Sequence, residues 1–408
     1  MNKTKKLVPD LRFPEFSGEW EMMGLDEVCS FHKGKGISKA DISENGIECI
    51  RYGELYTTYN EIIKNIVSKT NCNIKDLILS NENDIILPSS GETAIDISTA
   101  SCVINKKIAL GGDINIIRSK ENGIFLAYYL NNVKKKDIAR LSQGISVIHL
   151  YNTQLKELKI NLPSLPEQEK IASFLTKIDE KIEKLERKKE LWVDYKKGVM
   201  QGIFSRDIRF KDDEGNNFPD WEEKRLGEIV LEYKLGGNYK NTIIQTKNPL
   251  IKMGNINRGN ININKIEYID ETEEIQKKDL IKYGDLFFNT RNTLDLVGKV
   301  AIWRNELDKA YYNSNLMRIT FKNNFFMNYY LNSHQALSQL KAFATGTTSV
   351  AAIYTRDLLT LKIKLSSLPE QEKIANFLSS LDTKIDVLER EIEKNKGFKR
   401  GLLQGLFV

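Results

Sequence analysis

Two long stretches of the chain repeat apolar residues at seven-residue intervals, with Glu and Lys on either side. A repeat of this kind over several heptads is typical of paired α-helices, whose apolar seam faces the partner helix. We therefore predict one helix over residues 165–204 and a second over residues 368–407. The predicted seam consists of Ile171, Leu175, Ile178, Ile182 and Leu185 in the first helix and of Ile374, Leu378, Leu381, Ile385 and Leu388 in the second.

Polar residues mark where each helix begins and where its seam weakens. Each stretch opens with Ser-Leu-Pro-Glu-Gln-Glu, at Ser164 and Ser367, and a serine followed by proline and first-turn glutamates favours a helix N-terminus. Lys189, Lys196 and Lys399 occupy seam positions, so we expect the later half of each seam to be weaker or frayed. At 1.5 Å per residue, each helix would be about 60 Å long, or about 50 Å with a frayed end.

The two stretches are copies of one another. Residues 165–204 and 368–407 align without a gap, and about 22 of the 40 positions are identical. The segments that precede them are also related, but more faintly; for example, Trp20-Glu21 corresponds to Trp221-Glu222. Repetition at half the chain length indicates a duplication. We predict four parts: a first domain (1–162), a spacer helix (163–204), a second domain (205–365) and a second spacer helix (366–408).

The two domains are predicted to be rich in β-structure. Short β-branched and aromatic runs are broken by Gly and Asn, with one or two helices between them. The predicted strands are Ile62–Val67, Asp84–Leu87, Asp113–Arg118, Ile261–Tyr268, Asp285–Asn289 and Leu316–Thr320, and the predicted helices are Phe125–Lys135 and Phe326–Phe343. The predicted fold class is α+β, with two pseudo-symmetric β-rich domains separated by two long helices.

The long helices have two possible arrangements. Each could pack on its own domain as an ordinary amphipathic helix. A strict seven-residue repeat of this length instead favours pairing of the two copies in an antiparallel coiled coil, because a whole domain separates them in the sequence. Closely similar helices joined to more strongly diverged domains suggest two domains that read different sequences, held on a spacer of fixed length. That spacer is at least as long as one turn of B-DNA, about 34 Å, so the domains could reach successive major-groove faces.

Composition and charge exclude several classes of protein but do not by themselves identify the function of the chain. The 408 residues carry 61 Lys+Arg and 55 Asp+Glu, and the resulting net charge of +6 is weak evidence for an anionic partner. No apolar run resembles a signal peptide, and none approaches the length of a membrane span. The cysteines, Cys29, Cys49, Cys72 and Cys102, show no CxxC spacing, which is typical of reduced thiols in a cytoplasmic protein. The scattered histidines argue against a metal site, and we expect no cofactor.

Several loops carry the side chains that contact phosphates and base edges. Both domains have a basic, glycine-containing loop early in their sequence, where glycine permits close backbone approach and lysine suits phosphate. The second domain also offers Arg for guanine and Asn for adenine directly after a predicted strand. Taken singly, each loop could equally be a solvated turn. The candidate DNA-binding residues are Lys33, Lys35, Lys39, Tyr52, Ser89, Ser90, Gln143 and Ser146 in the first domain, and Lys234, Asn238, Lys240, Lys252, Asn255, Thr290, Arg291, Asn292, Thr345, Thr347, Thr348 and Ser349 in the second.

Catalytic motifs are missing from the sequence. Neither basic loop has the GxxxxGK[ST] order of a nucleotide-binding P-loop, and no two prolines are adjacent as in the motif of amino-methyltransferases. Residues 220–224 superficially offer the carboxylates and lysine of a metal-dependent nuclease, but the first domain lacks the lysine at the corresponding place. We therefore expect no catalytic residues in this chain.

The chain resembles the specificity subunit of Type I restriction–modification systems. The resemblance rests on the duplicated Leu-Pro-Glu-Gln-Glu-Lys-Ile-Ala-x-Phe-Leu helices, which end in Gln-Gly-(Ile/Leu)-Phe, and it spans essentially the whole chain. Gly284-Asp285-Leu286-Phe287-Phe288 and Gly346-Thr347-Thr348-Ser349 support it. Pro88-Ser89-Ser90-Gly91 departs from the usual Thr/Arg-type loop of that family.

This resemblance implies a non-catalytic protein with defined partners. Two target-recognition domains would each read one half of a split site in double-stranded DNA. The helices would set the spacing and dock two methylation subunits, and restriction subunits would join for cleavage, with no membrane involved. Two alternatives come from other classes: a coiled-coil scaffold whose domains bind proteins, and a stand-alone nuclease.

Overall fold

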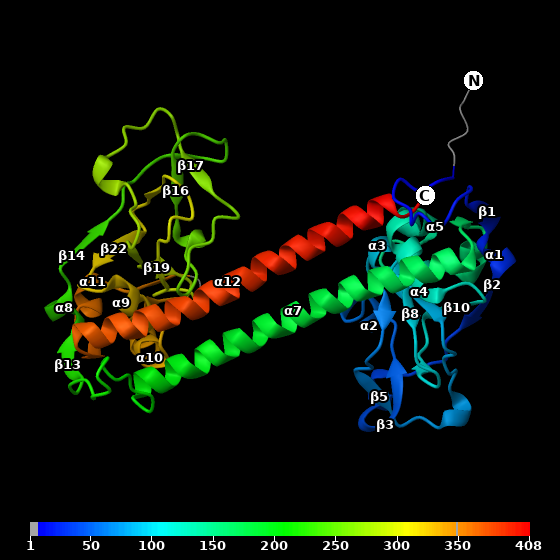
Figure 1. Ribbon diagram of the computed structural model, residues 1–408, viewed down its shortest axis with the longest axis horizontal. Helices are drawn as coiled ribbons and strands as arrows, with labels where there is room; N and C mark the ends of the chain where they lie inside the picture. The colour runs from blue at the N-terminus through cyan, green and yellow to red at the C-terminus, as the bar shows by residue number, and fades with distance from the viewer. Residues whose placement is uncertain (1–6, 348–349) are drawn as a thin grey trace. The chain divides into compact units, whose positions relative to one another are not determined.

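Two α+β units make up the structure, and each combines one domain with parts of both long helices. The computed structural model describes residues 7–347 and 350–408 (Figure 1). Unit 1 comprises residues 1–186 and 390–408, and unit 2 comprises residues 187–389. Each helix therefore contributes to both units.

The first domain, in unit 1, is built on a five-stranded sheet of order β2-β10-β6-β8-β4, in which only β4 and β8 are parallel. A three-stranded sheet, β5-β3-β9, and the pairs β1-β12 and β7-β11 complete it. The strands are β1 Glu21–Gly24, β2 Cys29–Lys33, β3 Ile42–Ile50, β4 Ile62–Ile63, β5 Ser68–Thr70, β6 Asp84–Pro88, β7 Ser90–Gly91, β8 Ser101–Val103, β9 Ala109–Leu110, β10 Ile114–Ser119, β11 Ile148–His149 and β12 Lys159–Leu162. The helices are α1 Leu25–Val28, α2 Glu54–Thr57, α3 Ala94–Ile97, α4 Gly123–Tyr129, α5 Lys135–Leu141 and α6 Asn152–Lys156.

The second domain, in unit 2, repeats this plan with a four-stranded sheet of order β14-β22-β18-β20. A second four-stranded sheet, β15-β17-β16-β21, a three-stranded sheet, β19-β24-β23, and the pair β13-β25 accompany it. The strands are β13 Glu222–Arg225, β14 Glu232–Leu235, β15 Asn241–Thr242, β16 Pro249–Ile251, β17 Glu267–Ile269, β18 Leu286–Asn289, β19 Arg291–Asn292, β20 Val300–Ile302, β21 Tyr311–Tyr312, β22 Leu316–Thr320, β23 Thr345–Gly346, β24 Ala351–Ala352 and β25 Lys362–Leu365. The helices are α8 Leu226–Ile229, α9 Asn324–Leu331, α10 His334–Phe343 and α11 Thr355–Leu358.

Most of the predicted elements of the domains are present, but four differ. The predicted helix Phe125–Lys135 is divided among α4, a π-helical segment at Leu130–Lys134 and α5. Residues Ile62–Val67 form a strand only at β4, and residues Ile261–Tyr268 only from Glu267 onward. In the latter segment the Asn262 side chain accepts a hydrogen bond from the backbone N–H of Asn264, which holds a turn in place of a ladder. The single predicted helix Phe326–Phe343 is two helices, because Ser333 caps α10 by accepting from the backbone N–H of Ala336.

Both domains share a partly buried ion pair at equivalent positions of their main sheets. Asp84, at the start of β6, accepts from Arg118 of β10 with an Nε–Oδ1 distance of 3.0 Å. Asp285, which precedes β18, pairs with Arg318 of β22 at 3.1 Å. The Asp84 side chain is 2% exposed and that of Asp285 17%. The repeated pair shows that the faint sequence correspondence between the domains reflects one shared framework.

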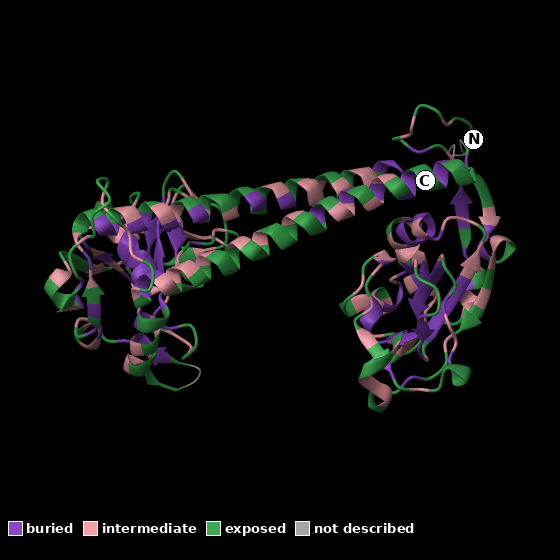
Figure 2. Ribbon diagram, turned by 60° about the horizontal axis from the view of Figure 1, so that its bottom comes forward, coloured by how far each residue is buried: buried purple, intermediate pink, exposed green. Residues whose placement is uncertain are grey.

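The long helices α7 (Leu165–Ser205) and α12 (Leu368–Gly405) pair in antiparallel fashion within each unit. In unit 1, Asp179 and Glu186 of α7 pair with Lys399 and Lys396 of α12 at 2.7 Å, so residue numbers rise on one helix as they fall on the other. In unit 2, Lys189 and Lys196 of α7 pair in the same sense with Glu389 and Asp382 of α12. Buried residues recur along both helices (Figure 2).

The predicted seam residues lie at this interface or in the domain cores. Eight of them are at most 8% exposed, and Leu185 and Ile385 are half-buried. The expectation that the later half of each seam would fray is wrong, because both helices continue through the seam lysines. The physical reason is charge pairing across the seam: Lys189, Lys196 and Lys399 each contact a carboxylate of the opposite helix. A paired cation tolerates a seam position that an unpaired one would not.

Each long helix begins in one unit and ends in the aromatic core of the other domain. Phe204, near the end of α7, packs against Phe326 and Tyr330 of α9, with ring centroids 5.9 and 5.3 Å apart. Phe407, just after α12, packs in the same way against Phe125 and Tyr129 of α4, at 5.5 and 5.9 Å. The repeated Gln-Gly-(Ile/Leu)-Phe ending of the two helices therefore packs an equivalent phenylalanine into the aromatic core of each domain.

Candidate nucleic-acid interface

The basic loop of the first domain borders a groove of about 770 Å³. The loop is tied to the neighbouring chain by hydrogen bonds from the backbone N–H groups of Gly34 and Lys35 to the carbonyls of Ile114 and Leu110. A Cβ on Gly34 would lie 1.9 Å from the carbonyl oxygen of Gly111, so only glycine allows this approach. Lys33, Lys35 and Lys39 are all exposed on it.

Cationic and aromatic side chains gather in that groove. Lys39 and Tyr52 both line it, together with Arg51, Tyr56 and Asp113. Arg51 is held in place by Glu54, whose Oε1 atom lies 3.0 Å from the Arg51 Nε atom. Tyr52 is 38% exposed, so its ring is available for stacking. Sequence reasoning missed Arg51 and Tyr56. Ile50-Arg51-Tyr52-Gly53 corresponds to Ile251-Lys252-Met253-Gly254 in the second domain, and this similarity is a signal that could have indicated the turn.

A small strand pair brings two further predicted loops of the first domain together. Ser90 in β7 pairs with His149 in β11, and Gln143 exchanges backbone hydrogen bonds with the same His149. Gln143 and Ser146 are exposed, whereas Ser89 and Ser90 are only 3% and 7% exposed. The two serines therefore contribute to the framework of this site more than to its surface.

The second domain places its corresponding loops side by side in the same manner. Arg291 of β19 and Thr345 of β23 both lie opposite Ala352 of β24. Arg291 and Thr345 are exposed, Thr290 and Asn292 are half-buried, and Thr347 follows β23 on the surface. Thr348 and Ser349 lie outside the described residues. The position occupied by serine in the first domain thus carries an exposed arginine in the second.

The basic loop of the second domain is shaped by glycine as in the first. Gly237 donates its N–H to the carbonyl of Tyr312, and a Cβ on Gly236 would lie 2.2 Å from the same oxygen. Asn238 and Lys240 are exposed, but the Lys234 ammonium lies 2.9 Å from the buried Asp279 carboxylate. Tyr239 donates to the same carboxylate, and burial together with this contact raises the pKa of Tyr239 to about 12.

Two further predicted residues of the second domain are engaged inside the domain. The Lys252 ammonium lies 2.9 Å from the Glu267 carboxylate. Asn255 is 5% exposed, and its side-chain amide donates to the carbonyls of Asn262 and Lys265. Its oxygen accepts from the backbone N–H of Lys252, as Glu54 accepts from Arg51 in the first domain. These hydrogen bonds build the turn that presents the exposed Met253.

Two cations of the second domain, which sequence reasoning missed, share one neighbourhood without an acidic partner. Burial lowers the pKa of Arg258, and burial followed by the charge of Arg258 lowers the pKa of Lys299. Within residues 7–347 and 350–408, neither side chain forms an ion pair with a carboxylate. As a whole residue Arg258 is exposed, and its guanidinium donates a hydrogen bond to the backbone carbonyl of Asp295. Two neighbouring cations without a carboxylate partner favour an anionic ligand such as a phosphate group.

The part of the chain that the structure describes contains neither a candidate metal-binding group nor a membrane-spanning helix. No group of three or more His, Cys, Asp and Glu side chains there is placed to hold a metal ion. No helix among the described residues is long and apolar enough to cross a bilayer. The four cysteines are free thiols, and burial raises the pKa of Cys102 to about 12, which disfavours its reactive thiolate form.

Comparison with known proteins connects this architecture to a family. A model described as "Type I restriction modification DNA specificity domain" matches residues 17–192 and again residues 219–395. The MjaVIII Type I restriction enzyme specificity subunit of Methanocaldococcus jannaschii is 27% identical, over 98% of this chain and 93% of that protein. The EcoKI specificity subunit of Escherichia coli is 18% identical, over 81% of this chain and 74% of that protein.

A solved structure shares the fold. The crystal structure of the Type I restriction–modification S subunit from M. genitalium aligns with a TM-score of 0.66 and 17% identity, covering 98% of this chain and 99% of that one. The family model accounts for most of the sequence in two copies, one in each half. The chain therefore belongs to the Type I restriction–modification DNA specificity family.

Proposed function

We propose that this chain selects the DNA sequence for a Type I restriction–modification complex, with each domain reading one half of a bipartite site. The observation that carries the proposal is the pair of corresponding loop sites, built on one framework but differing in chemistry. In the first domain these loops bring the buried Ser90 to the exposed Gln143–Ser146 loop, and in the second domain the corresponding loops present Arg291 beside Thr345. One framework with two sets of side chains suits two different half-sites.

The contacts to DNA divide into two kinds under this proposal. The exposed lysines of the basic loops, together with Arg258 and Lys299, contact phosphates and position the duplex. Arg291, Asn292 and the Gln143–Ser146 loop contact base edges. Ser89, Ser90 and Asn255, which are buried, support those loops. Phosphate contacts give salt-dependent affinity and base contacts give specificity.

The partners follow from the helices. Two methylation subunits dock on the paired helices, and restriction subunits join the full complex. Leu191, Tyr195 and Val387 on these helices are 52%, 50% and 48% exposed, which supports a protein-binding surface there. Methyl transfer and cleavage belong to those partners, and this chain has no catalytic role. A complex purified with its methylation subunits should protect an asymmetric, bipartite sequence.

The alternative is a scaffold whose two domains bind proteins. The two functions differ in their response to salt. A complex that contacts several phosphates loses affinity for DNA steeply as the salt concentration rises. A protein scaffold would bind DNA only non-specifically, so an excess of random competitor duplex would remove the bound DNA.

Arg291→Ala is expected to weaken recognition of one half-site only. A bidentate arginine–guanine contact is worth about 1–3 kcal/mol, so discrimination at one position should fall by a factor of about 5 to about 150. The assay is methylation of duplexes altered in either half by the variant complex. Arg225→Ala, which changes an exposed arginine of β13 in another sheet, is the control and should leave both halves unchanged. An equal loss of activity on duplexes altered in either half and on random DNA would mean that Arg291 contacts a phosphate group and not a base.

A further inference from the structure

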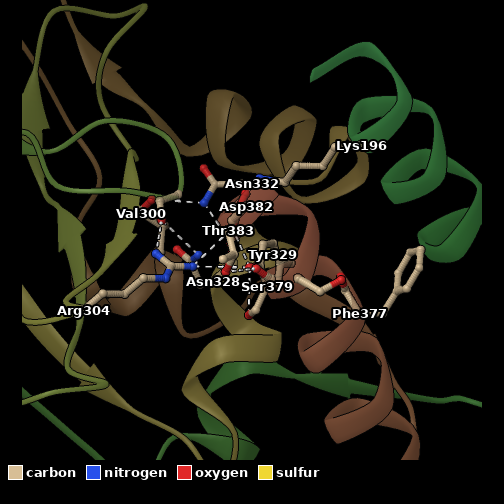
Figure 3. Close-up of polar contacts among 12 residues, drawn as sticks. Lys196, Val300, Arg304, Asn328, Tyr329, Asn332, Phe377, Ser379, Asp382 and Thr383 are labelled. Atoms are coloured by element: carbon tan, nitrogen blue, oxygen red, sulfur yellow. Dashed lines mark hydrogen bonds and ion pairs between the residues drawn. The ribbon is translucent and has the colours of Figure 1, made fainter. Parts of the chain in front are cut away.

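One carboxylate in unit 2 collects side chains from both long helices and from the domain (Figure 3). Asp382 of α12 accepts a 2.6 Å hydrogen bond from the hydroxyl of Tyr329 in α9. Lys196 of α7 pairs with the other oxygen of the same carboxylate. Arg304, from the segment after β20, approaches to 3.3 Å, and Ser379 contacts the Tyr329 hydroxyl at 3.1 Å.

Unit 1 contains the same arrangement with the helices exchanged. Asp179 lies on α7 and accepts from the hydroxyl of Tyr128 in α4. Lys399 of α12 pairs with Asp179 at 2.7 Å and lies over the Tyr128 ring, 5.2 Å from its centroid. In unit 2 the corresponding distance from Lys196 to the Tyr329 ring is 5.4 Å. We call each tyrosine–aspartate–lysine set a helix clamp.

The helix clamp is repeated in the sequence, but its surroundings are not. Asp179 and Asp382, like Lys196 and Lys399, are related by the offset that aligns the two helices. In the first domain a fourth residue, Glu61, adds negative charge 3.4 Å from the clamp lysine. In the second domain Arg304 adds positive charge at the clamp aspartate. The shared geometry therefore does not depend on one fixed local charge.

The clamp groups are desolvated and directional. The charged side chains are only 17–22% exposed, so their mutual attraction is screened less than at the surface. Burial, followed by the neighbouring aspartate, raises the pKa of both tyrosine hydroxyls, so each remains a proton donor to its carboxylate. Apolar packing of Phe204 and Phe407 has no such direction. A domain that turned about the helices, or a helix that slid by one turn, would have to break the clamp.

We propose that the helix clamps position each domain on the paired helices and thereby restrict the spacing between the two half-sites that the chain accepts. The proposal rests on the proposed function, since it assumes that both domains engage one DNA molecule. Tyr128, Asp179, Lys196, Tyr329, Asp382 and Lys399 are positioning residues that contact no base.

Tyr329→Phe removes one hydroxyl and leaves the ring under Lys196. Tyr330→Phe is the matched control, because the hydroxyl of this adjacent buried tyrosine accepts from the backbone N–H of Lys364 inside the domain. The assay is methyl transfer by the complex to duplexes whose half-sites keep the natural spacing or are moved by one or two base pairs. We expect the preference for natural spacing to fall about tenfold in Tyr329→Phe, as for one lost charge-assisted hydrogen bond, and to persist in Tyr330→Phe.

The outcomes separate this inference from the proposed function. A Tyr329→Phe complex with wild-type spacing preference, or one that loses activity equally at every spacing, would overturn the clamp. Lys196→Gln, which breaks the contact between the helices and keeps the tyrosine, provides a second variant with the same expected relaxation if Tyr329→Phe does not assemble. A wild-type complex without any bipartite preference would instead refute the proposed function. Relaxed spacing with unchanged half-site sequence supports both.

Discussion

Replacing Phe407 with alanine is expected to lower the opening free energy of unit 1 by about 3 kcal/mol, toward the lower end of the range for buried Phe→Ala changes. Phe407 is 7% exposed and fills the space beside Phe125 and Tyr129. Its loss leaves a cavity between α4 and the end of α12 that the last turn can only partly fill. Hydrogen exchange of the backbone amides in residues 123–130 measures the effect.

Phe398→Ala is the matched control for this change. Phe398 lies on the same helix and in the same unit but is 55% exposed, so its truncation should cost less than about 0.5 kcal/mol. Amides of residues 324–331 in unit 2 should exchange as in the unaltered protein. If Phe407→Ala and Phe398→Ala had equal effects, packing of Phe407 in the core would not be what stabilises the first domain.

Neutralising the first-turn glutamates of the two long helices should have opposite effects on stability. Glu167 of α7 receives two hydrogen bonds from Arg12, at 2.9 and 2.8 Å, so Glu167→Gln is expected to cost about 2–3 kcal/mol, somewhat less than a fully buried pair. Glu370 of α12 is 1% exposed and accepts from Trp221, but its nearest guanidinium, that of Arg209, lies 3.7 Å away. Burial raises the pKa of Glu370 despite these contacts. Glu370→Gln is therefore expected to raise the free energy of unfolding at pH 7.

The pH dependence shows whether the stabilisation comes from removing the buried charge of Glu370 or from a local change in packing. Because the folded-state pKa of Glu370 lies above its ordinary value of 4.5, its carboxyl contributes most stability below pH 4.5 and loses that contribution as the pH rises through the folded value. The advantage of Glu370→Gln should therefore grow from pH 4 upward and then level off. The measurement is denaturation of the Glu370→Gln variant and of the unaltered protein between pH 4 and 8. An advantage that stayed constant with pH would contradict the assignment.

The paired helices could be predicted from the sequence because their pattern is local. Seven-residue spacing places Ile171, Leu175 and Ile178 on one face whatever the rest of the chain does. The seam lysines could not be interpreted in the same way. Lys399 is stable at its position because Asp179 lies opposite, and those two residues are more than two hundred positions apart in the sequence.

The candidate site was predictable only in part, because polar residues beside glycine serve two purposes. Arg291 and Tyr52 are exposed as a reading surface requires. Asn255 has the same kind of sequence environment but is buried by the hydrogen bonds that close its turn. The clamp tyrosines gave a weak signal, since Phe125-Leu126-Ala127-Tyr128-Tyr129 and Phe326-Met327-Asn328-Tyr329-Tyr330 match, but their aspartate partners emerge only from packing.

Exchange of the first domain tests the central claim most directly. Residues 21–160 are replaced by the corresponding domain of another specificity subunit, and the methylated sequences are mapped in cells that also carry the methylation subunits. The account predicts a new sequence in one half of the site, with the other half retained. An unchanged methylated sequence would contradict the claim that each domain reads its own half.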